Sequence, residues 1–221
     1  MFIKFIFDRV TAFVGLLLLC PVFVIVAILI RLKMPGGPVI FRQQRVGLKG
    51  KLFTMVKFRT MAVNHHGSPV SVSGDNRITP LGAKLRKYKI DELLELWNVL
   101  IGEMSFVGPR PDVPGYADQL QGNDRRVLEL RPGITGPASM KFRDEEETLA
   151  HVKDLLYYKK EMIFEKGLRI SSVKEYNDKV LYPKKVSLNL YYLDHYSFID
   201  DIRMIYCTVL RKKMKYHGEM I

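Results

Sequence analysis

The most constraining feature of this sequence is an uncharged apolar run near its start, Thr11 to Ile30, which is flanked by Arg9 and Arg31. As an α-helix, such a run would be about 30 Å long, which matches the hydrocarbon core of a bilayer. It is too long for a secretory signal, and no small-residue cleavage site follows it. We therefore predict a retained membrane element over residues 1–33 and a second domain over residues 34–221.

Cys20 and Pro21 lie almost in the middle of the apolar run. Proline removes one backbone donor and clashes with the preceding turn, so it bends a helix. The segment can then span the bilayer with a kink, or dip in, turn at Pro21 and return to the same face. Both of its ends are basic, which favours a common cytoplasmic side. Spanning helices also tolerate proline, so the residues alone leave both arrangements open.

The charge of the chain predicts an anionic partner. The net charge is +12, and no acidic residue occurs between Asp8 and Asp75. Nucleic acid, a phospholipid surface and a phosphate-rich substrate would all suit such a chain. A basic block directly beside an apolar run favours the membrane over nucleic acid. A hydrophobic content of 48% excludes a disordered chain.

Several common kinds of site are excluded by what the sequence lacks. Cys20 and Cys207 have no Cys-x-x-Cys or Cys/His spacing around them, which excludes a disulfide framework and a zinc site. There is no Walker A loop, no Gly-x-Gly-x-x-Gly and no Gly-x-Ser-x-Gly. A polar loop is predicted over residues 67–76. His65 and His66 lie in the polar stretch at its start, and we interpret them as surface residues.

The rest of the chain is predicted to be mainly α-helical with a small β-hairpin, an α+β fold. After a linker at residues 34–38, the hairpin pairs residues 39–45 with residues 52–59 across a glycine-flanked turn. Further helices are expected over residues 80–87, 90–101, 116–130, 145–166 and 199–210. Gly108 to Pro111 must form a rigid loop. The last helix is basic and amphipathic, so it either lies in the lipid interface or packs on the core.

Asp91 and Glu92 stand at the start of the helix expected over residues 90–101. Side chains of adjacent helical residues point about 100° apart, so the pair can serve two roles at one place. Acids in a first helical turn also simply suit the helix dipole. Arg86, Arg110 and Arg131 lie on or beside stiff backbone, where arginine can clamp phosphate with two donors.

At this point the sequence resembles the monotopic polyprenyl-phosphate phosphoglycosyl transferases, the bacterial sugar transferase family. The resemblance covers nearly the whole chain, and its most specific part is Met104 to Pro111. The other matching segments are Cys20–Pro21, Phe41–Gly47, Lys57–Met61, Ile90–Leu93, Leu96–Leu100 and Arg131–Gly136.

The resemblance implies an enzyme at the cytoplasmic face of the bacterial inner membrane, with a re-entrant rather than a spanning helix broken at Cys20 and Pro21. Asp91 would attack the phosphorus next to the sugar of a nucleoside diphosphate sugar, which the resemblance implies is a uridine diphosphate (UDP) sugar. Polyprenyl phosphate, such as undecaprenyl phosphate, would then take the phosphosugar. Glu92, the second catalytic residue implied, would help to hold Mg²⁺ and to support the acceptor step. The substrate-binding residues implied are Lys57, Arg59, Arg86, Arg110, Pro111 and Arg131.

The resemblance also implies a phospholipid membrane and downstream glycosyltransferases as partners, allows a homodimer, and involves no nucleic acid. Some positions depart from the family pattern: Lys89 replaces a frequent helix cap, Leu94 replaces a frequent proline, and residues 137–143 and the long insertion 144–170 differ. These departures leave the sugar open. The rival functions are a non-catalytic membrane scaffold of the same fold and a basic nucleic-acid binder.

Overall fold

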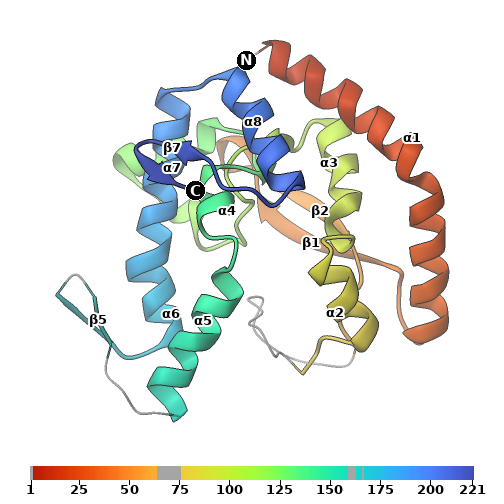
Figure 1. Ribbon diagram of the computed structural model, residues 1–221, viewed down its shortest axis with the longest axis horizontal. Coiled ribbons are helices and arrows are strands. Elements are labelled where there is room, and N and C mark those ends of the chain that lie inside the picture. The colour runs from red at the N-terminus through yellow and green to blue at the C-terminus, as the bar shows by residue number, and fades with distance from the viewer. Residues whose placement is uncertain (1, 64–75, 159–162, 166) are drawn as a thin grey trace.

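The computed structural model describes residues 2–63, 76–158, 163–165 and 167–221. His65, His66 and most of the polar loop predicted around them lie outside these residues. The fold is mostly helical with small two-stranded sheets, as predicted, and Figure 1 shows α1 (Phe2–Lys33) along one flank and α7 (Tyr182–Asp194) on the opposite side. The predicted hairpin is one of several such sheets.

α1 is a single continuous helix with Pro21 inside it. Figure 1 shows the helix changing direction part-way along its length, but the predicted break at Cys20 and Pro21 is not confirmed. The helix is long and apolar enough to cross a membrane by length and composition. Most of its large apolar side chains are exposed, whereas Ala12, Val26 and Ile30 are buried against the rest of the protein.

Both halves of α1 are docked on the same domain. Near its start, Asp8 is buried and its Oδ2 accepts a hydrogen bond of 2.7 Å from Ser105 Oγ. Near its end, Val26 and Ile30 pack in one cluster with Phe58. A carboxylate removed from water needs such partners, so the contact at Asp8 fixes the position of this part of the helix.

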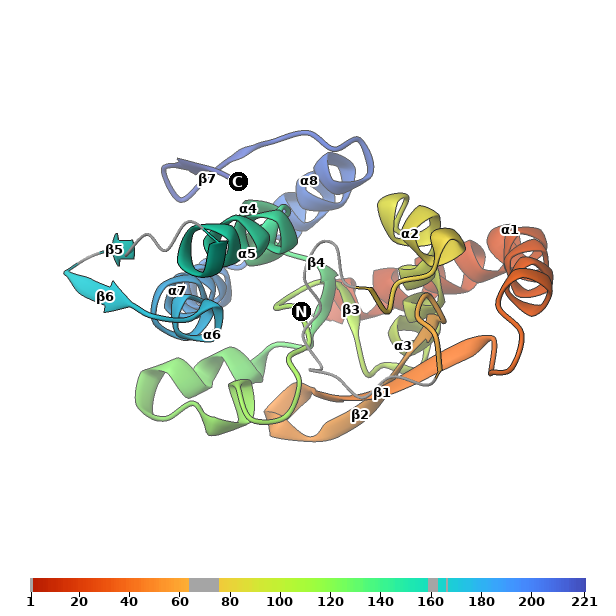
Figure 2. The same ribbon diagram turned by 90° about the horizontal axis from the view of Figure 1, so that it is seen from below.

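The predicted hairpin is confirmed. β1 (Ile40–Val46) pairs antiparallel with β2 (Leu52–Phe58), and the short 3₁₀ turn Leu48–Gly50 connects them. Gly50 takes a φ of 76°, a conformation that glycine adopts at little cost. Phe53 and Met55 of β2 are buried together with Val99 and Ala12. The hairpin therefore lies beneath α3 (Glu95–Ile101), as Figure 2 shows.

α2 (Pro80–Lys87) and the helix that follows begin and end nearly where the sequence predicts. Thr79 caps α2 by accepting a hydrogen bond from the amide of Gly82 at 3.0 Å. The helix predicted from residue 90 begins as a 3₁₀ turn, η2 (Asp91–Leu94), and continues as α3. Gly102 ends α3 with a φ of 94°.

A short parallel pair, β3 (Ser105–Val107) with β4 (Gly133–Thr135), forms the centre of the molecule. The rigid loop predicted after β3 is confirmed as non-helical. A Cβ atom on Gly108 would lie 2.2 Å from the carbonyl oxygen of Arg131, and one on Gly133 would lie 2.2 Å from the amide nitrogen of Gly108. The backbone at Gly108 and the backbone at Arg131 and Gly133 are therefore in direct contact, with no room for a side chain between them. This backbone packing keeps the Gly-Pro-Arg-Pro loop in place.

Two predicted helices are wrong in part. Residues 116–130 form two 3₁₀ segments, η3 (Ala117–Gln119) and η4 (Gly122–Glu129), instead of one helix. Arg125 Nη1 donates to the carbonyl oxygens of Asp118 and Leu120, which satisfies groups that a continuous helix would have used. In the 145–166 region, α5 (Glu145–Lys153) passes through a π-turn (Asp154–Tyr158) to the hairpin of β5 (Ile163–Glu165) with β6 (Leu168–Ile170).

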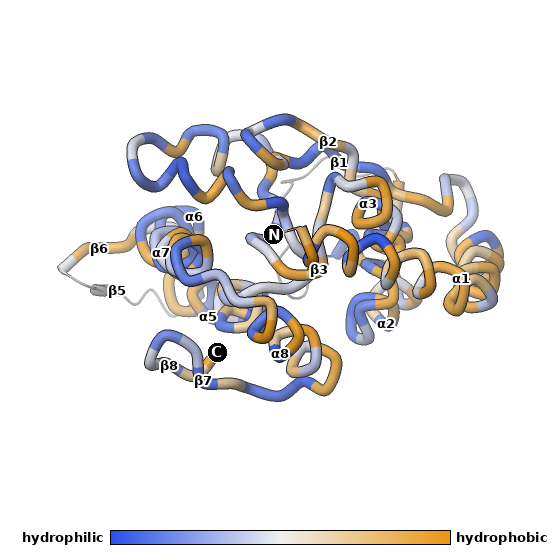
Figure 3. Tube along the Cα trace, turned by 90° about the horizontal axis from the view of Figure 1, so that it is seen from above, coloured by the Kyte–Doolittle hydropathy of each residue, from blue (hydrophilic) through white to orange (hydrophobic). Residues whose placement is uncertain are grey.

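The C-terminal part packs around α7 and α8 (Phe198–Val209). The other elements here are α4 (Pro137–Lys141), α6 (Val173–Tyr176), the π-turn η6 (Asn177–Leu181), β7 (Lys215–Tyr216) and β8 (Glu219–Met220). Met204 and Cys207 of α8 face the core, whereas the predicted apolar face is largely exposed, including Ile199, Tyr206 and Val209. Figure 3 shows that α1 is apolar along most of its length, whereas α8 combines hydrophobic and hydrophilic residues.

Candidate active site

The candidate site is built where a tight reversal of the chain joins α2 to η2. Lys89 takes a left-handed φ of 57°, and the amide of Ile90 donates to the carbonyl of Leu85 at 2.9 Å. The reversal turns the next residue, Asp91, back into the protein. Asp91 is 6% exposed, and its Oδ1 atom is buried without a hydrogen-bond partner among the residues that the structure describes.

The surroundings of Asp91 make its ionised form energetically costly. Burial raises the pKa of Asp91, and the negative charge of Glu92 raises it further, while Lys57, Lys89 and Arg86 act in the opposite direction. A carboxylate that is poorly solvated and lacks a partner is a more reactive base and nucleophile than one in water. Asp91 is thus an acceptor held ready for a positive or electrophilic centre.

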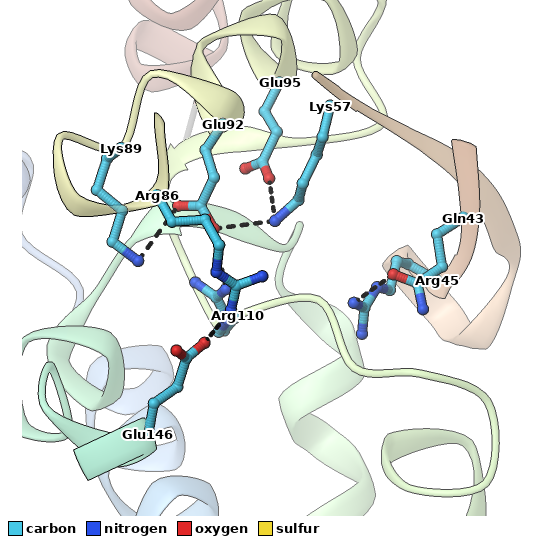
Figure 4. Close-up of polar contacts among 9 residues, drawn as sticks. All are labelled: Gln43, Arg45, Lys57, Arg86, Lys89, Glu92, Glu95, Arg110 and Glu146. Carbon is cyan, nitrogen blue, oxygen red and sulfur yellow. Dashed lines mark hydrogen bonds and ion pairs between the residues drawn. The ribbon is translucent and has the colours of Figure 1, made fainter. Parts of the chain in front are cut away.

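Glu92 has the opposite electrostatic environment to Asp91. Its Oε1 accepts hydrogen bonds from Lys57 Nζ at 2.9 Å and from Arg110 Nη2 at 3.1 Å, and Lys89 Nζ lies 3.9 Å from Oε2. Figure 4 shows these cations converging on Glu92 from separate parts of the chain. Burial alone would raise the pKa of Glu92, but these cations outweigh it and hold the pKa well below its usual range. Glu92 is therefore a permanently ionised carboxylate.

A second carboxylate, Glu95, lies one turn further along and contacts the same lysine. Lys57 Nζ is 3.0 Å from Glu95 Oε1 as well as 2.9 Å from Glu92 Oε1. Glu95 is 4% exposed, and burial raises its pKa despite the opposing charge of Lys57. Lys57 therefore bridges two carboxylates from one face of β2.

Arg110 and Pro111 bring the rigid loop to the same place. They line a small pocket together with Arg45, Lys57 and Glu95. Arg110 is half-exposed, and the charge of Glu92 raises its pKa further above the usual range, so it stays charged. Burial lowers the pKa of Arg45, and repulsion from Arg110 adds to that effect. Two arginines that repel each other across a pocket favour an anion between them.

The remaining predicted cations divide between this site and other places. Arg86 contributes to the field at Asp91 and pairs through Nη2 with Glu146 Oε1 at 2.5 Å. Arg59 is buried and donates from Nη2 to the carbonyl oxygen of Met34, so it ties β2 to the end of α1. Arg131 donates from Nε to the carbonyl of Gly102 at 3.0 Å and lies over the ring of Phe5.

The site therefore gathers Lys57, Arg86, Asp91, Glu92, Arg110 and Pro111, all predicted from the sequence. Arg59 and Arg131 instead contact α1 or the linker that follows it, and their part in substrate binding stays a prediction.

Comparison with known proteins identifies the family of this chain. A family model described as "Bacterial sugar transferase" matches residues 1–171. The chain belongs to this family. It is 33% identical over 219 residues to an "Uncharacterized sugar transferase EpsL" of Bacillus subtilis (strain 168), covering 99% of this chain and 90% of that protein.

Two further relatives carry named activities. A "UDP-glucose:undecaprenyl-phosphate glucose-1-phosphate transferase" of Escherichia coli (strain K12) is 33% identical over 92% of this chain. A "UDP-N-acetylgalactosamine-undecaprenyl-phosphate N-acetylgalactosaminephosphotransferase" of Aeromonas hydrophila is 38% identical over 71% of it. This transferase family member spans 39% of the length of each of these two relatives.

Sequence reasoning missed Glu95, Arg45 and Glu146. Glu95 is four residues after Asp91 on a helix, a spacing that puts both on one face, and this could have indicated it. Arg45 lies within the matched segment Phe41–Gly47 but gave no separate signal. Glu146 belongs to the insertion, and its contact with Arg86 joins residues 60 positions apart.

Two oxygen atoms of the site fit a magnesium ion. Among the described residues, no group of three or more His, Cys, Asp or Glu side chains could hold a metal by itself. Mg²⁺, however, takes only one or two protein carboxylates and completes its shell with phosphates and water. Within the described parts of the chain, Oδ1 of Asp91 has no hydrogen-bond partner, and Oε2 of Glu92 lies 3.9 Å from Lys89 Nζ, so both are suitable ligands.

Proposed function

We propose that this transferase moves a sugar-1-phosphate from a UDP-sugar to undecaprenyl phosphate or a similar polyprenyl phosphate through a phosphosugar bound covalently to Asp91. The observation that carries the proposal is the buried, unpartnered Oδ1 of Asp91 beside an ionised Glu92 and several cations. The named relatives act on UDP-sugars and undecaprenyl phosphate, which supports this substrate class. They carry different sugars, so no one sugar is assigned.

In the first step, an Asp91 oxygen attacks the phosphorus atom that bears the sugar. The bond between that phosphorus and the bridging oxygen breaks, and uridine monophosphate leaves with the electron pair. An acyl phosphate joins Asp91 to the sugar. In the second step, a phosphate oxygen of the polyprenyl phosphate attacks the same phosphorus, which forms the lipid diphosphate sugar and restores the carboxylate of Asp91.

The surrounding cations serve both steps. Arg110 and Lys57 are charged donors at the site, and they can pass from Glu92 to the phosphate oxygens of the substrate. Mg²⁺, held by Glu92 and Asp91 when bound, would neutralise charge on the diphosphate. The buried position of Asp91 keeps water away from the acyl phosphate that this carboxylate would carry.

The function is tested by supplying membranes that contain the protein with a panel of UDP-sugars and undecaprenyl phosphate. Release of uridine monophosphate with one or a few sugars, dependent on the lipid for turnover, is expected. A scaffold of the same fold would release none with any sugar.

The product is a lipid-linked phosphosugar, so we propose glycosyltransferases of polysaccharide synthesis as downstream partners.

We also propose that α1 is re-entrant and that the site lies at the cytoplasmic face of the inner membrane. Lys4 pairs with Asp201 at 2.6 Å near one end of α1, while Ile30 packs against Phe58 and Leu85 near the other. A helix that crossed the bilayer would leave its two ends on opposite sides. Contact of both ends with one domain supports a return to the same face, and the exposed apolar residues of α8 suit the interface beside it.

Labelling tests this topology. In a Cys20→Ser, Cys207→Ser background, Phe2→Cys in spheroplasts is expected to resist an impermeant maleimide until the membrane is permeabilised. Lys213→Cys is the matched control, because position 213 is exposed and lies in the C-terminal part of the domain. Labelling of Phe2→Cys from outside, with Lys213→Cys still protected, would contradict the re-entrant arrangement.

Adding Pro21→Ala to Phe2→Cys is expected to raise outside labelling, because the helix can then straighten and span.

The insertion is expected to weaken substrate binding through Glu146. This half-exposed carboxylate pairs with Arg86, one of the cations that act on Asp91. Glu146→Gln is therefore expected to lower the KM for the UDP-sugar about two- to fivefold with little change in kcat, since exposed ion pairs are worth about 0.2–1 kcal/mol. Steady-state kinetics give both constants. Glu147→Gln is the neighbouring control, and an unchanged KM in Glu146→Gln would contradict the prediction.

A further inference from the structure

Lys57 occupies an unusual position for a single ammonium group. Its Nζ atom is 2.9 Å from Glu92 Oε1 and 3.0 Å from Glu95 Oε1, and its side chain is 15% exposed. One of these carboxylates, Glu92, belongs to the pair beside the proposed nucleophile. The other, Glu95, has no part in the mechanism described so far. A long, flexible lysine held at two points loses much of its freedom, so both contacts fix where its charge lies.

The contacts between α3 and β2 fix the distance between Glu95 and Lys57. Glu95 begins α3, and three residues later Asn98 joins α3 to β2, the strand that carries Lys57. Asn98 Nδ2 donates to the carbonyl oxygen of Thr54 at 2.8 Å, and Asn98 Oδ1 accepts from the amide of Val56 at 3.2 Å. Because Asn98 is almost fully buried, these bonds set the register of α3 against the strand.

We propose that Glu95 is a positioning residue, which holds the Lys57 ammonium beside Glu92 and so sets the electric field at Asp91. This inference rests on the proposed function, in which Asp91 is the nucleophile. Glu95 takes up part of the positive charge of Lys57, which leaves Asp91 less stabilised and more reactive. It also anchors Lys57 when an incoming diphosphate competes with Glu92 for that lysine.

The charges that face Glu95 come from every element around it. They are Lys57 of β2, Glu92 of η2, Arg110 of the rigid loop and Arg45 of β1. Lys57 Nζ lies 2.9 Å from Glu92 Oε1 and 3.0 Å from Glu95 Oε1, so removing the carboxylate of Glu95 leaves this ammonium held by Glu92 alone.

The test compares kcat/KM for Glu95→Ala, which loses the anchor, with kcat/KM for Glu95→Gln, which keeps the size and an acceptor oxygen for Lys57. Glu95→Ala is expected to lose about tenfold or more in kcat/KM. Glu95→Gln is expected to recover part of this loss, because its amide oxygen can still accept a hydrogen bond from Lys57 Nζ. An unchanged kcat/KM in Glu95→Ala, or no recovery in Glu95→Gln, would overturn the proposal.

A second measurement does not depend on catalysis. Competitive acetylation with acetic anhydride, read by mass spectrometry, reports how freely each amine reacts. In the wild type, Lys57 is expected to react about tenfold more slowly than Lys89, whose side chain is 62% exposed. In Glu95→Ala, Lys57 is expected to react several times faster while Lys89 stays unchanged. Equal rates for the two lysines in the wild type, or an unchanged Lys57 in Glu95→Ala, would overturn the proposed anchor.

The two measurements separate failure of this inference from failure of the proposed function. If wild-type membranes release no uridine monophosphate, the transferase proposal is wrong, and the acetylation rates still decide whether Glu95 holds Lys57. If turnover is normal but Glu95→Ala changes neither kcat/KM nor the reactivity of Lys57, the mechanism stands and the role of Glu95 is refuted. Melting curves of both variants show whether each remains folded, and acetylation of the wild type needs no variant.

Discussion

Asp91→Asn is expected to lower kcat by about four orders of magnitude or more, because the amide cannot form the covalent intermediate. The measurement is release of uridine monophosphate from the preferred UDP-sugar. Mass spectrometry of protein quenched during turnover is expected to show a phosphosugar on the peptide that contains Asp91, and to show none in the variant. The substitution removes a buried, poorly partnered negative charge, so the melting temperature is expected to stay the same or rise.

The matched control is Asp124→Asn, because Asp124 is exposed at the start of η4. It is expected to behave as the wild type. Retained turnover in Asp91→Asn would remove the nucleophile from the mechanism. If turnover were then lost in Glu92→Gln, the covalent role would belong to the neighbouring carboxylate. Loss of folding in Asp91→Asn, seen as an early melting transition, would contradict the expected stability.

The second large effect is expected from Arg110→Ala, with a loss of about 10²- to 10³-fold in kcat/KM, the usual cost of removing one charged or hydrogen-bonding group that stabilises a transition state. Arg110 is held by a loop whose two prolines and close glycine contacts do not depend on its side chain. The fold should therefore survive. Glu92 would also lose a cation that lowers its pKa, so its pKa is expected to rise.

Arg110→Lys is expected to recover only part of the activity, because an ammonium cannot donate two parallel hydrogen bonds to a phosphate. Arg126→Ala is the control, since Arg126 of η4 pairs with Asp194 of α7, outside the proposed site. Full activity in Arg110→Ala would show that the loop serves only the packing of β3 against β4. Full recovery by lysine would show that charge alone is needed.

Local chemistry made part of this architecture predictable. The helix over residues 80–87, the hairpin with its glycine-flanked turn, and the helix ending at residue 101 were predicted and are confirmed. Each of these depends on one or two residues and their neighbours. The interval from Tyr116 to Leu130 was predicted as one helix and was wrong, because Arg125 satisfies carbonyl groups that local patterns assign to helical bonds.

In the candidate site too, local sequence patterns predicted some residues, whereas contacts between distant parts of the chain determine the others. Asp91 and Glu92 were found because they are adjacent in sequence, and Arg110 because two prolines frame it. The role of Glu95 depends on Lys57, which comes from a strand 38 positions earlier, and no local pattern joins them. Arg59 was predicted from the family resemblance, and Arg131 also from the stiff backbone beside it. Packing against the linker and α1 instead decides where their guanidinium groups lie.

The way α1 is shared with the rest of the molecule decides where the polypeptide can be shortened. Ala12, Val26 and Ile30 are integral to the apolar clusters that also hold Val99 and Phe58. A truncated version starting at Met34 would expose the apolar surface of β2 and α3 that α1 covers, and this surface would promote aggregation instead of yielding a soluble fragment. Preparations that keep the first helix, in detergent or nanodiscs, therefore suit this enzyme better than truncation.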